Sequence, residues 1–140
     1  MWKCKHTGII FGPPVAMGRP RMTRTGRAYT PAKSREYMEL AIEQIRENWG
    51  NNVQLANEPL RLHLVFVHKR PKRITATERV PKTTKPDIDN LIKMVMDALT
   101  KSEIWTDDNI VTEVGASDWY ANEYEQPHTM YSIYTKEPPF

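Results

Sequence analysis

The sequence contains 140 residues, of which 39% are hydrophobic and 26% are charged. This length and composition exclude a fully disordered chain, and we expect one domain over residues 1–140. No stretch is long and apolar enough to span a membrane, and the N-terminus lacks the apolar region of a signal peptide, so we expect a soluble cytoplasmic protein. The single cysteine, Cys4, excludes an intrachain disulfide and a cysteine-built zinc site.

The net charge of +3 conceals an uneven distribution along the chain. Residues 1–35 carry eight bases and no acid, and residues 69–85 carry seven bases and one acid. Residues 97–140 carry two bases and nine acids. The basic segments could bind a polyanion, with counterion release supplying affinity, or they could neutralise the acidic C-terminal part within the protein. Charge alone leaves both interpretations open.

The first half of the chain predicts one strand, one loop and one helix. Residues 7–11 read as a short strand that the following Gly-Pro-Pro ends. Residues 12–30 are rich in Gly, Pro, Arg and Thr without an apolar period, which predicts a loop. Thr30 is expected to cap a helix with Pro31 at its first position, and apolar residues recur at helical spacing up to Trp49.

The second half predicts three further strands and a second helix. Residues 60–68 alternate as a strand whose second face is half apolar, which indicates a central position in the sheet. We expect a basic loop without regular structure at 69–86, and a helix at 87–100. A third strand is expected over 110–120 with a break near Ser117, a fourth over 129–135, and a frayed tail at 136–140.

This order of elements predicts an α+β fold, with two main helices packed on one face of a small mixed sheet of about four strands. The apolar stripe of the second helix is expected to face that sheet. Its members are Ile88, Leu91, Ile92, Val95 and Leu99.

A group of acids surrounds the start of the second helix. Asp87 and Asp89 lie two residues apart, and Asp89, Lys93 and Asp97 share one helix face at intervals of four. Asp107 and Asp108 follow before the next strand. Hard divalent cations such as Mg²⁺ prefer carboxylate oxygens, and a bound cation could activate water and stabilise charge on a phosphodiester.

Purely structural roles could also account for these acids. An acid in the first turn of a helix is stabilised by the helix dipole. Lys93 could form ordinary i,i+4 ion pairs with Asp89 and Asp97, and Asp107 and Asp108 could be turn residues. The spacing of the acids therefore leaves a metal site and a structural role equally open.

The ordered combination of these motifs is more specific than any one of them. The segments Lys85-Pro-Asp-Ile-Asp-Asn-Leu-Ile-Lys93, Met96-Asp-Ala-Leu99 and Trp105-Thr-Asp-Asp108 together resemble the RusA family of Holliday junction resolvases. The basic stretch from Arg19 to Pro31 is similar to the entry segment of RusA-like proteins, many of which are encoded by phages and prophages. The resemblance covers roughly residues 9–115.

The resemblance implies a small α+β homodimer that resolves four-way DNA junctions by paired symmetric nicks during recombination and repair. It implies dependence on Mg²⁺, which Mn²⁺ could replace, with no nucleotide cofactor, and action on the DNA of a bacterial nucleoid. Catalytic roles fall on Asp87, Asp89 and Asp108, and the functional helix lysine falls on Lys93. Asp107 matches the first acid of the later pair and is a further candidate metal ligand.

The two basic segments supply the candidates for contacts with DNA phosphates. They are Arg19, Arg21, Arg24, Arg27, Lys69, Arg70, Lys72, Arg73, Arg79, Lys82 and Lys85. Two other functions remain open on the sequence: a metal-dependent nuclease for other targets such as flaps, forks or RNA, and a DNA-binding protein without catalysis. A nucleotide-sugar transferase with a DxD motif is disfavoured, because the chain is short and has no glycine-rich phosphate loop.

Overall fold

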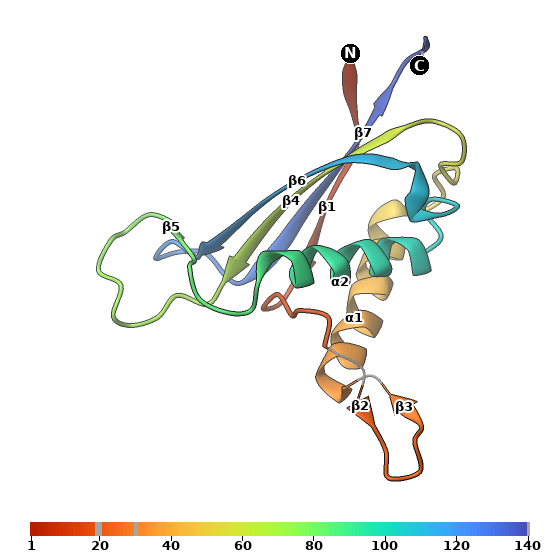
Figure 1. Ribbon diagram of the computed structural model, residues 1–140. Coiled ribbons are helices and arrows are strands. Elements are labelled where there is room, and N and C mark those ends of the chain that lie inside the picture. Colours follow the sequence, from red (N-terminus) through yellow and green to blue (C-terminus); the bar gives the residue numbers. More distant parts are fainter. Residues whose placement is uncertain (19–20, 30, 140) are drawn as a thin grey trace.

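The structure is a computed structural model that describes residues 1–18, 21–29 and 31–139 (Figure 1). Its elements are, in chain order, β1 (Trp2–Phe11), β2 (Arg21–Met22), β3 (Ala28–Tyr29), α1 (Ala32–Trp49), β4 (Leu60–His68), β5 (Val80–Pro81), α2 (Ile88–Lys101), the 3-10 helix η1 (Asp108–Ile110), β6 (Val111–Tyr120) and β7 (His128–Lys136).

The main sheet has five strands in the order β1-β7-β4-β6-β5. Strands β4 and β6 run parallel and are connected through α2, whereas the other neighbouring pairs are antiparallel. The predicted α+β fold with a mixed sheet is confirmed. The expected number of about four strands is corrected to five, because β5 adds a short edge strand from within the basic loop.

Both helices pack on one face of the sheet (Figure 1). On β4, the side chains of Leu60, Leu62, Leu64 and Phe66 are at most 1% exposed and face the helices. The β4 residues that alternate with these four, Val65 among them, face the opposite side of the sheet, where a smaller apolar cluster forms. Because both faces of β4 are covered, its predicted central position is confirmed.

Leu91, Val95 and Leu99 of the expected stripe are buried and Ile92 is partly buried against the core, as predicted for helix α2. Its buried residues are Leu91, Met94, Val95, Ala98 and Leu99. Ile88 is 38% exposed, because it occupies the first position of the helix beside a pocket against residues 82–84. The buried surface of the helix therefore also includes Met94 and Ala98, while the acid Asp89 and the base Lys93 remain exposed.

Several local expectations are corrected by the structure. Residues 21–29 form the β2–β3 hairpin instead of a loop, closed by hydrogen bonds between Thr23 and Arg27. Pro31 is the N-cap of α1 and not its first helical residue; Thr30 lies outside the described residues. Strand β6 continues through Ser117, because its ladder with β4 is unbroken from Glu113 to Tyr120. In the described parts of the chain, no helix has the length and apolarity to cross a membrane.

Candidate active site

The start of α2 presents two carboxylates to solvent. Asp87 occupies the N-cap position with an extended backbone, but its side chain makes no capping hydrogen bond. Asp89 lies in the first turn, where one carboxylate oxygen accepts a hydrogen bond from the Asn90 N–H at 3.0 Å. Both side chains are exposed, and Lys93 follows on the exposed side of the helix one turn later. The expected placement of these three residues at the start of a helix is therefore observed.

The later acid pair lies at the other end of the same helix surface. Asp107 caps the short helix η1 by accepting a hydrogen bond from the Asp108 N–H at 2.7 Å. The pKa of Asp108 is raised, first by partial desolvation and then by the hydrogen bond and negative charge of Asp107 and the negative charge of Asp97 on α2. The negative charges of Asp97 and Asp107 therefore lie close enough to Asp108 to raise its pKa.

The ion pairs found in residues 1–18, 21–29 and 31–139 include none of these acids. In particular, Lys93 forms no ion pair with Asp89 or Asp97, although the i,i+4 spacing would allow one. Asp87 likewise does not cap the helix through its side chain. The ion pairs that the spacing suggested for Lys93 are therefore not formed, whereas Asp89 does lie in the first turn of α2 and Asp107 caps η1.

The carboxylates have the donor chemistry that a hard divalent cation requires. Partial desolvation, and then the hydrogen bond and negative charge of Asp107 and the negative charge of Asp97, raise the pKa of Asp108, and a cation would neutralise those charges. Within the described residues, however, no three acidic, histidine or cysteine side chains are gathered closely enough to hold an ion as they stand. The donor chemistry of these acids therefore suits a divalent cation, but the structure does not gather Asp87, Asp89 and Asp108 into one group.

A further carboxylate, that of Asp118, lies in a pocket beside Asp87. This pocket is formed by residues 82–84, the start of α2 and Asp118 of β6. One carboxylate oxygen of Asp118 lies 2.6 Å from Nε2 of His68, and both side chains are only 10% exposed. Sequence reasoning missed this pair. The available signal was a polar residue near the carboxyl end of each of two strands, which meet when those strands are parallel neighbours.

Apart from the short strand β5, residues 69–86 form the expected loop, but several of its bases are held within the protein. The guanidinium of Arg70 donates hydrogen bonds to the carbonyl oxygens of Ile74, Glu78 and Ala121 at 3.0–3.3 Å. Arg79 forms an ion pair with Glu125. The Lys82 ammonium donates to two carbonyl oxygens of residues 84 and 85. Three of the basic residues that were predicted to contact phosphate are thus already bound to other groups of the protein.

The other predicted phosphate contacts differ in their surroundings. Lys69, Lys72 and Lys85 are exposed in the loop, and the Arg73 guanidinium lies 5.8 Å from the centre of the Tyr120 ring. Arg24 and Arg27 are exposed on the hairpin, which extends away from the sheet (Figure 1). Arg19 and the side chain of Arg21 lie outside the described residues. In this view the start of α2 lies between the basic loop and the hairpin (Figure 1).

Carboxylates that can hold a divalent cation, together with exposed bases that can bind phosphate, are features of metal-dependent hydrolases of nucleic-acid phosphodiesters. The comparison with known families identifies the class further. The model of the family described as "Endodeoxyribonuclease RusA" matches residues 12–129. The chain therefore belongs to the RusA endodeoxyribonuclease family, and it is an endonuclease of DNA.

The chain is also similar to one curated protein of uncharacterized function. The chain is 31% identical over 129 residues to the uncharacterized protein YqaN of Bacillus subtilis (strain 168). The matched region spans 81% of this chain and 87% of that relative, so the similarity extends over most of both proteins.

Proposed function

We propose that this endonuclease resolves four-way DNA junctions by paired symmetric nicks, in a reaction that requires Mg²⁺ or Mn²⁺. Membership of the RusA family supports a branched DNA substrate. The observation that carries the proposal is the set of carboxylates at Asp87, Asp89 and Asp108, none of which forms an ion pair within the described residues. A cation that arrives together with the negatively charged phosphate would compensate these charges.

Asp87, Asp89 and Asp108 would hold the metal, with Asp107 as a further ligand. When bound, the cation supplies a polarised water and neutralises negative charge on the phosphate. The reaction itself is hydrolysis: the oxygen of water adds to phosphorus, the bond to the 3′ oxygen breaks, and that oxygen takes up a proton. The products are a 5′-phosphate and a 3′-hydroxyl.

The other residues of the site bind and orient the substrate. Lys93 is exposed on α2 one turn from Asp89, where its ammonium can bind the scissile phosphate and stabilise the charge that develops on it. Lys69, Lys72, Lys85, Arg24 and Arg27 are exposed on the basic loop and the hairpin, and they would bind flanking phosphates. These contacts supply affinity without reading the base sequence.

The proposal also includes a homodimer. A four-way junction has an approximate two-fold axis, and a dimer with two-fold symmetry presents one active site to each of two strands. The sheet face opposite the helices carries exposed apolar side chains that a second copy would cover, among them Phe11, which is 69% exposed. A phage or prophage origin stays a prediction.

Cleavage of three labelled substrates tests the proposal: a four-way junction, a flap and a linear duplex, each with Mg²⁺ and with EDTA. We expect paired nicks on the junction, lost in EDTA and reduced about 10²–10³-fold or more in Asp89→Asn, which should still bind the junction. Glu36→Gln removes one exposed acid from α1 and is the matched control, expected to cut at the wild-type rate.

Each other outcome has a distinct meaning. Preferential cleavage of the flap would assign a different branched substrate to the same site. Tight binding without cleavage under any metal would leave a DNA-binding protein. Wild-type activity in Asp89→Asn would show that the assignment of the site is wrong.

A further inference from the structure

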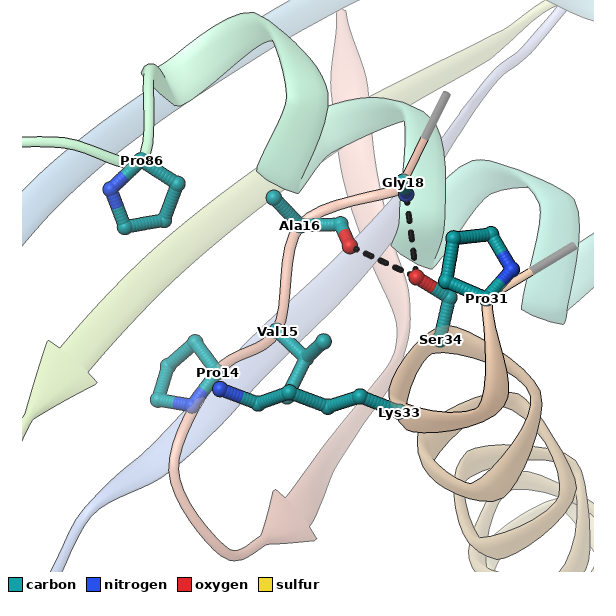
Figure 2. A pocket seen from close by; sticks show the side chains of 8 residues that line it. All are labelled: Pro14, Val15, Ala16, Gly18, Pro31, Lys33, Ser34 and Pro86. Atoms are coloured by element: carbon teal, nitrogen blue, oxygen red, sulfur yellow. Dashed lines mark hydrogen bonds between the residues drawn. The ribbon is translucent and has the colours of Figure 1, made fainter. Parts of the chain in front are cut away.

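A pocket of about 640 Å³ lies directly beside the proposed active site (Figure 2). It is bounded by the segment after β1, the first turn of α1 and the residue that precedes Asp87. The residues that line it are Pro14, Val15, Ala16, Gly18, Pro31, Lys33, Ser34 and Pro86. Neither the family match nor the proposed catalytic chemistry gives this pocket a role.

The wall of the pocket is held by hydrogen bonds. Ser34 is 4% exposed, and its hydroxyl accepts from the Gly18 N–H at 3.0 Å and donates to the Ala16 carbonyl at 3.3 Å (Figure 2). A Cβ at Gly18 would approach both Pro31 and Ser34 to 2.9 Å, so the chain passes α1 here with no space to spare. The pocket is thus formed by a well-anchored segment.

The same segment is attached to the start of α2. The Met17 N–H donates a hydrogen bond to the carbonyl oxygen of Asn90, 3.1 Å away in the first turn of the helix. Pro86 lines this pocket and also the pocket that contains Asp87. A group bound between Val15 and Pro86 would therefore lie at a set position relative to Asp87 and Asp89.

The chemistry of the pocket is a set of apolar walls with one flexible cation. Proline rings, Val15 and Ala16 form the walls, and the Lys33 side chain extends from α1 along Val15 towards Pro14 (Figure 2). Lys33 is exposed, and the ion pairs of the described residues do not include it. Apolar walls suit the faces of a planar ring, and an ammonium group suits a phosphate.

We infer that this pocket receives an unstacked base of the DNA strand, from a nucleotide next to the scissile phosphodiester, while Lys33 binds a phosphate of that nucleotide. The inference rests on the proposed function, because it takes the scissile phosphate to lie at Asp87 and Asp89. A DNA ligand agrees with the charge of this region, since residues 1–35 contain no acid.

This assignment has two consequences for how the enzyme would select its substrate. Removing a base from a duplex stack costs free energy, and the cost is smallest where stacking is already interrupted. A branch point meets that condition and an intact duplex does not, so the pocket favours branched DNA. A pocket of defined shape also discriminates among bases, which predicts a preference of about tenfold for certain bases beside the cut.

Fluorescence of 2-aminopurine, which increases when the base leaves the stack, tests the inference. The probe is placed singly at each nucleotide near the branch point of a four-way junction and bound to Asp89→Asn, so that the DNA stays intact. We expect a rise of about twofold or more at one nucleotide flanking the cut. Ala16→Phe fills the pocket and should abolish the rise, whereas Ala16→Ser leaves it open and should retain it.

A second variant, on the surface of the protein, keeps the test interpretable if Ala16→Phe does not fold. Lys33→Gln should reduce the rise and lower the salt slope of binding by about one, whereas Arg35→Gln on the same helix, outside the pocket, should change neither. Metal-dependent cleavage by the wild type is measured on the same junctions. The pocket assignment is wrong, and the proposed function stands, in two cases. In the first, the junction is cleaved but no fluorescence rise occurs. In the second, a rise occurs but both Ala16→Phe and Lys33→Gln leave it unchanged. If no junction is cleaved, the proposed function fails and the assignment fails with it.

Discussion

Arg79 shows how the surroundings of one residue decide what its charge does. It was a candidate for contact with DNA, but its guanidinium donates three hydrogen bonds to the Glu125 carboxylate. Glu125 also accepts from the Asn122 N–H at 3.0 Å. These partners lower the pKa of Glu125 from 4.5 to about 2, and the pair raises the pKa of Arg79. Arg79 therefore attaches the basic loop to the turn before β7.

The sign of the pKa shift at Glu125 gives a prediction for stability. The carboxylate is held ionised in the folded protein, so its contribution is present above pH 4.5 and is lost as the pH falls towards about 2. We expect this contribution to be about 1–2 kcal/mol after allowance for solvent screening at the partly exposed Arg79. Urea unfolding of the wild type and Glu125→Gln should give free energies of unfolding that converge across that pH range. The exposed Glu123→Gln should keep the wild-type pH dependence.

His68 and Asp118 illustrate the burial of a polar pair at the edge of the active site. Their side chains are 10% exposed and lie 2.6 Å apart, so each satisfies a group that would otherwise lose its contact with water. We expect Asp118→Ala to lower the free energy of unfolding by about 1–3 kcal/mol. The matched control is Glu113→Ala on the same strand, which removes an exposed pair with Arg61 and should cost less than about 1 kcal/mol. Equal effects of the two variants would contradict this role for the buried pair.

At the scale of elements, the basic loop contains two kinds of base. Arg70 binds three carbonyl oxygens of the protein, whereas Lys72 is exposed and free to meet phosphate. Removing Arg70 leaves these carbonyls without their donor, so the loop itself is expected to lose order. Removing Lys72 subtracts one phosphate contact and leaves the loop intact. Basic residues that look equivalent in the sequence therefore have different roles, one in holding the loop together and the other in binding phosphate.

This difference can be measured in the salt dependence of binding to a four-way junction. Lys72→Ala should lower the slope of log K against log salt by about one, with unchanged thermal stability. Arg70→Ala should lower protection of the loop from hydrogen exchange. Adding Arg73→Ala to these two changes should weaken binding further. If the triple variant kept the wild-type slope, the loop would not be part of the DNA interface.

At the scale of the whole molecule, the sheet has two unlike faces. The helices cover one face, and the other carries a small apolar cluster around Val65 and Val67 together with the exposed Phe11 and Ile9. Burying exposed apolar surface is the usual driving force for association. We therefore expect the proposed homodimer to form through the sheet face opposite the helices.

Phe11→Glu tests this interface. We expect light scattering with size-exclusion chromatography to show a shift from dimer to monomer, and paired nicks on the junction to become single nicks. Leu40→Glu is the control, because Leu40 is 57% exposed on α1 and lies on the helical side of the molecule. Dimers that persist in Phe11→Glu, or that are lost in Leu40→Glu, would place the interface elsewhere.

Local patterns in the sequence determined much of the fold. The alternation of residues 60–68 and the helical spacing up to Trp49 predicted elements that the structure confirms. Each of these signals depends only on neighbouring residues, because the periods of 2 and 3.6 reflect the geometry of one element. The motifs around Asp87, Asp89 and Asp107-Asp108 likewise led to the family from the sequence, since their order and spacing are linear features.

Tertiary structure decided which partners these residues have. No local pattern indicates that Arg70 and Arg79 are bound within the protein, that His68 meets Asp118, or that Lys33 lies near Pro86. These residues belong to separate segments, and they meet only when β4 and β6 become parallel neighbours and the first turn of α1 lines one pocket with Pro86. The sequence by itself determined the kinds of element and the chemistry available at the site. Long-range packing decided which charged side chains are paired within the protein and which remain exposed to bind DNA. The reason is that a charged side chain is neutralised by whichever group the fold brings within a few ångströms.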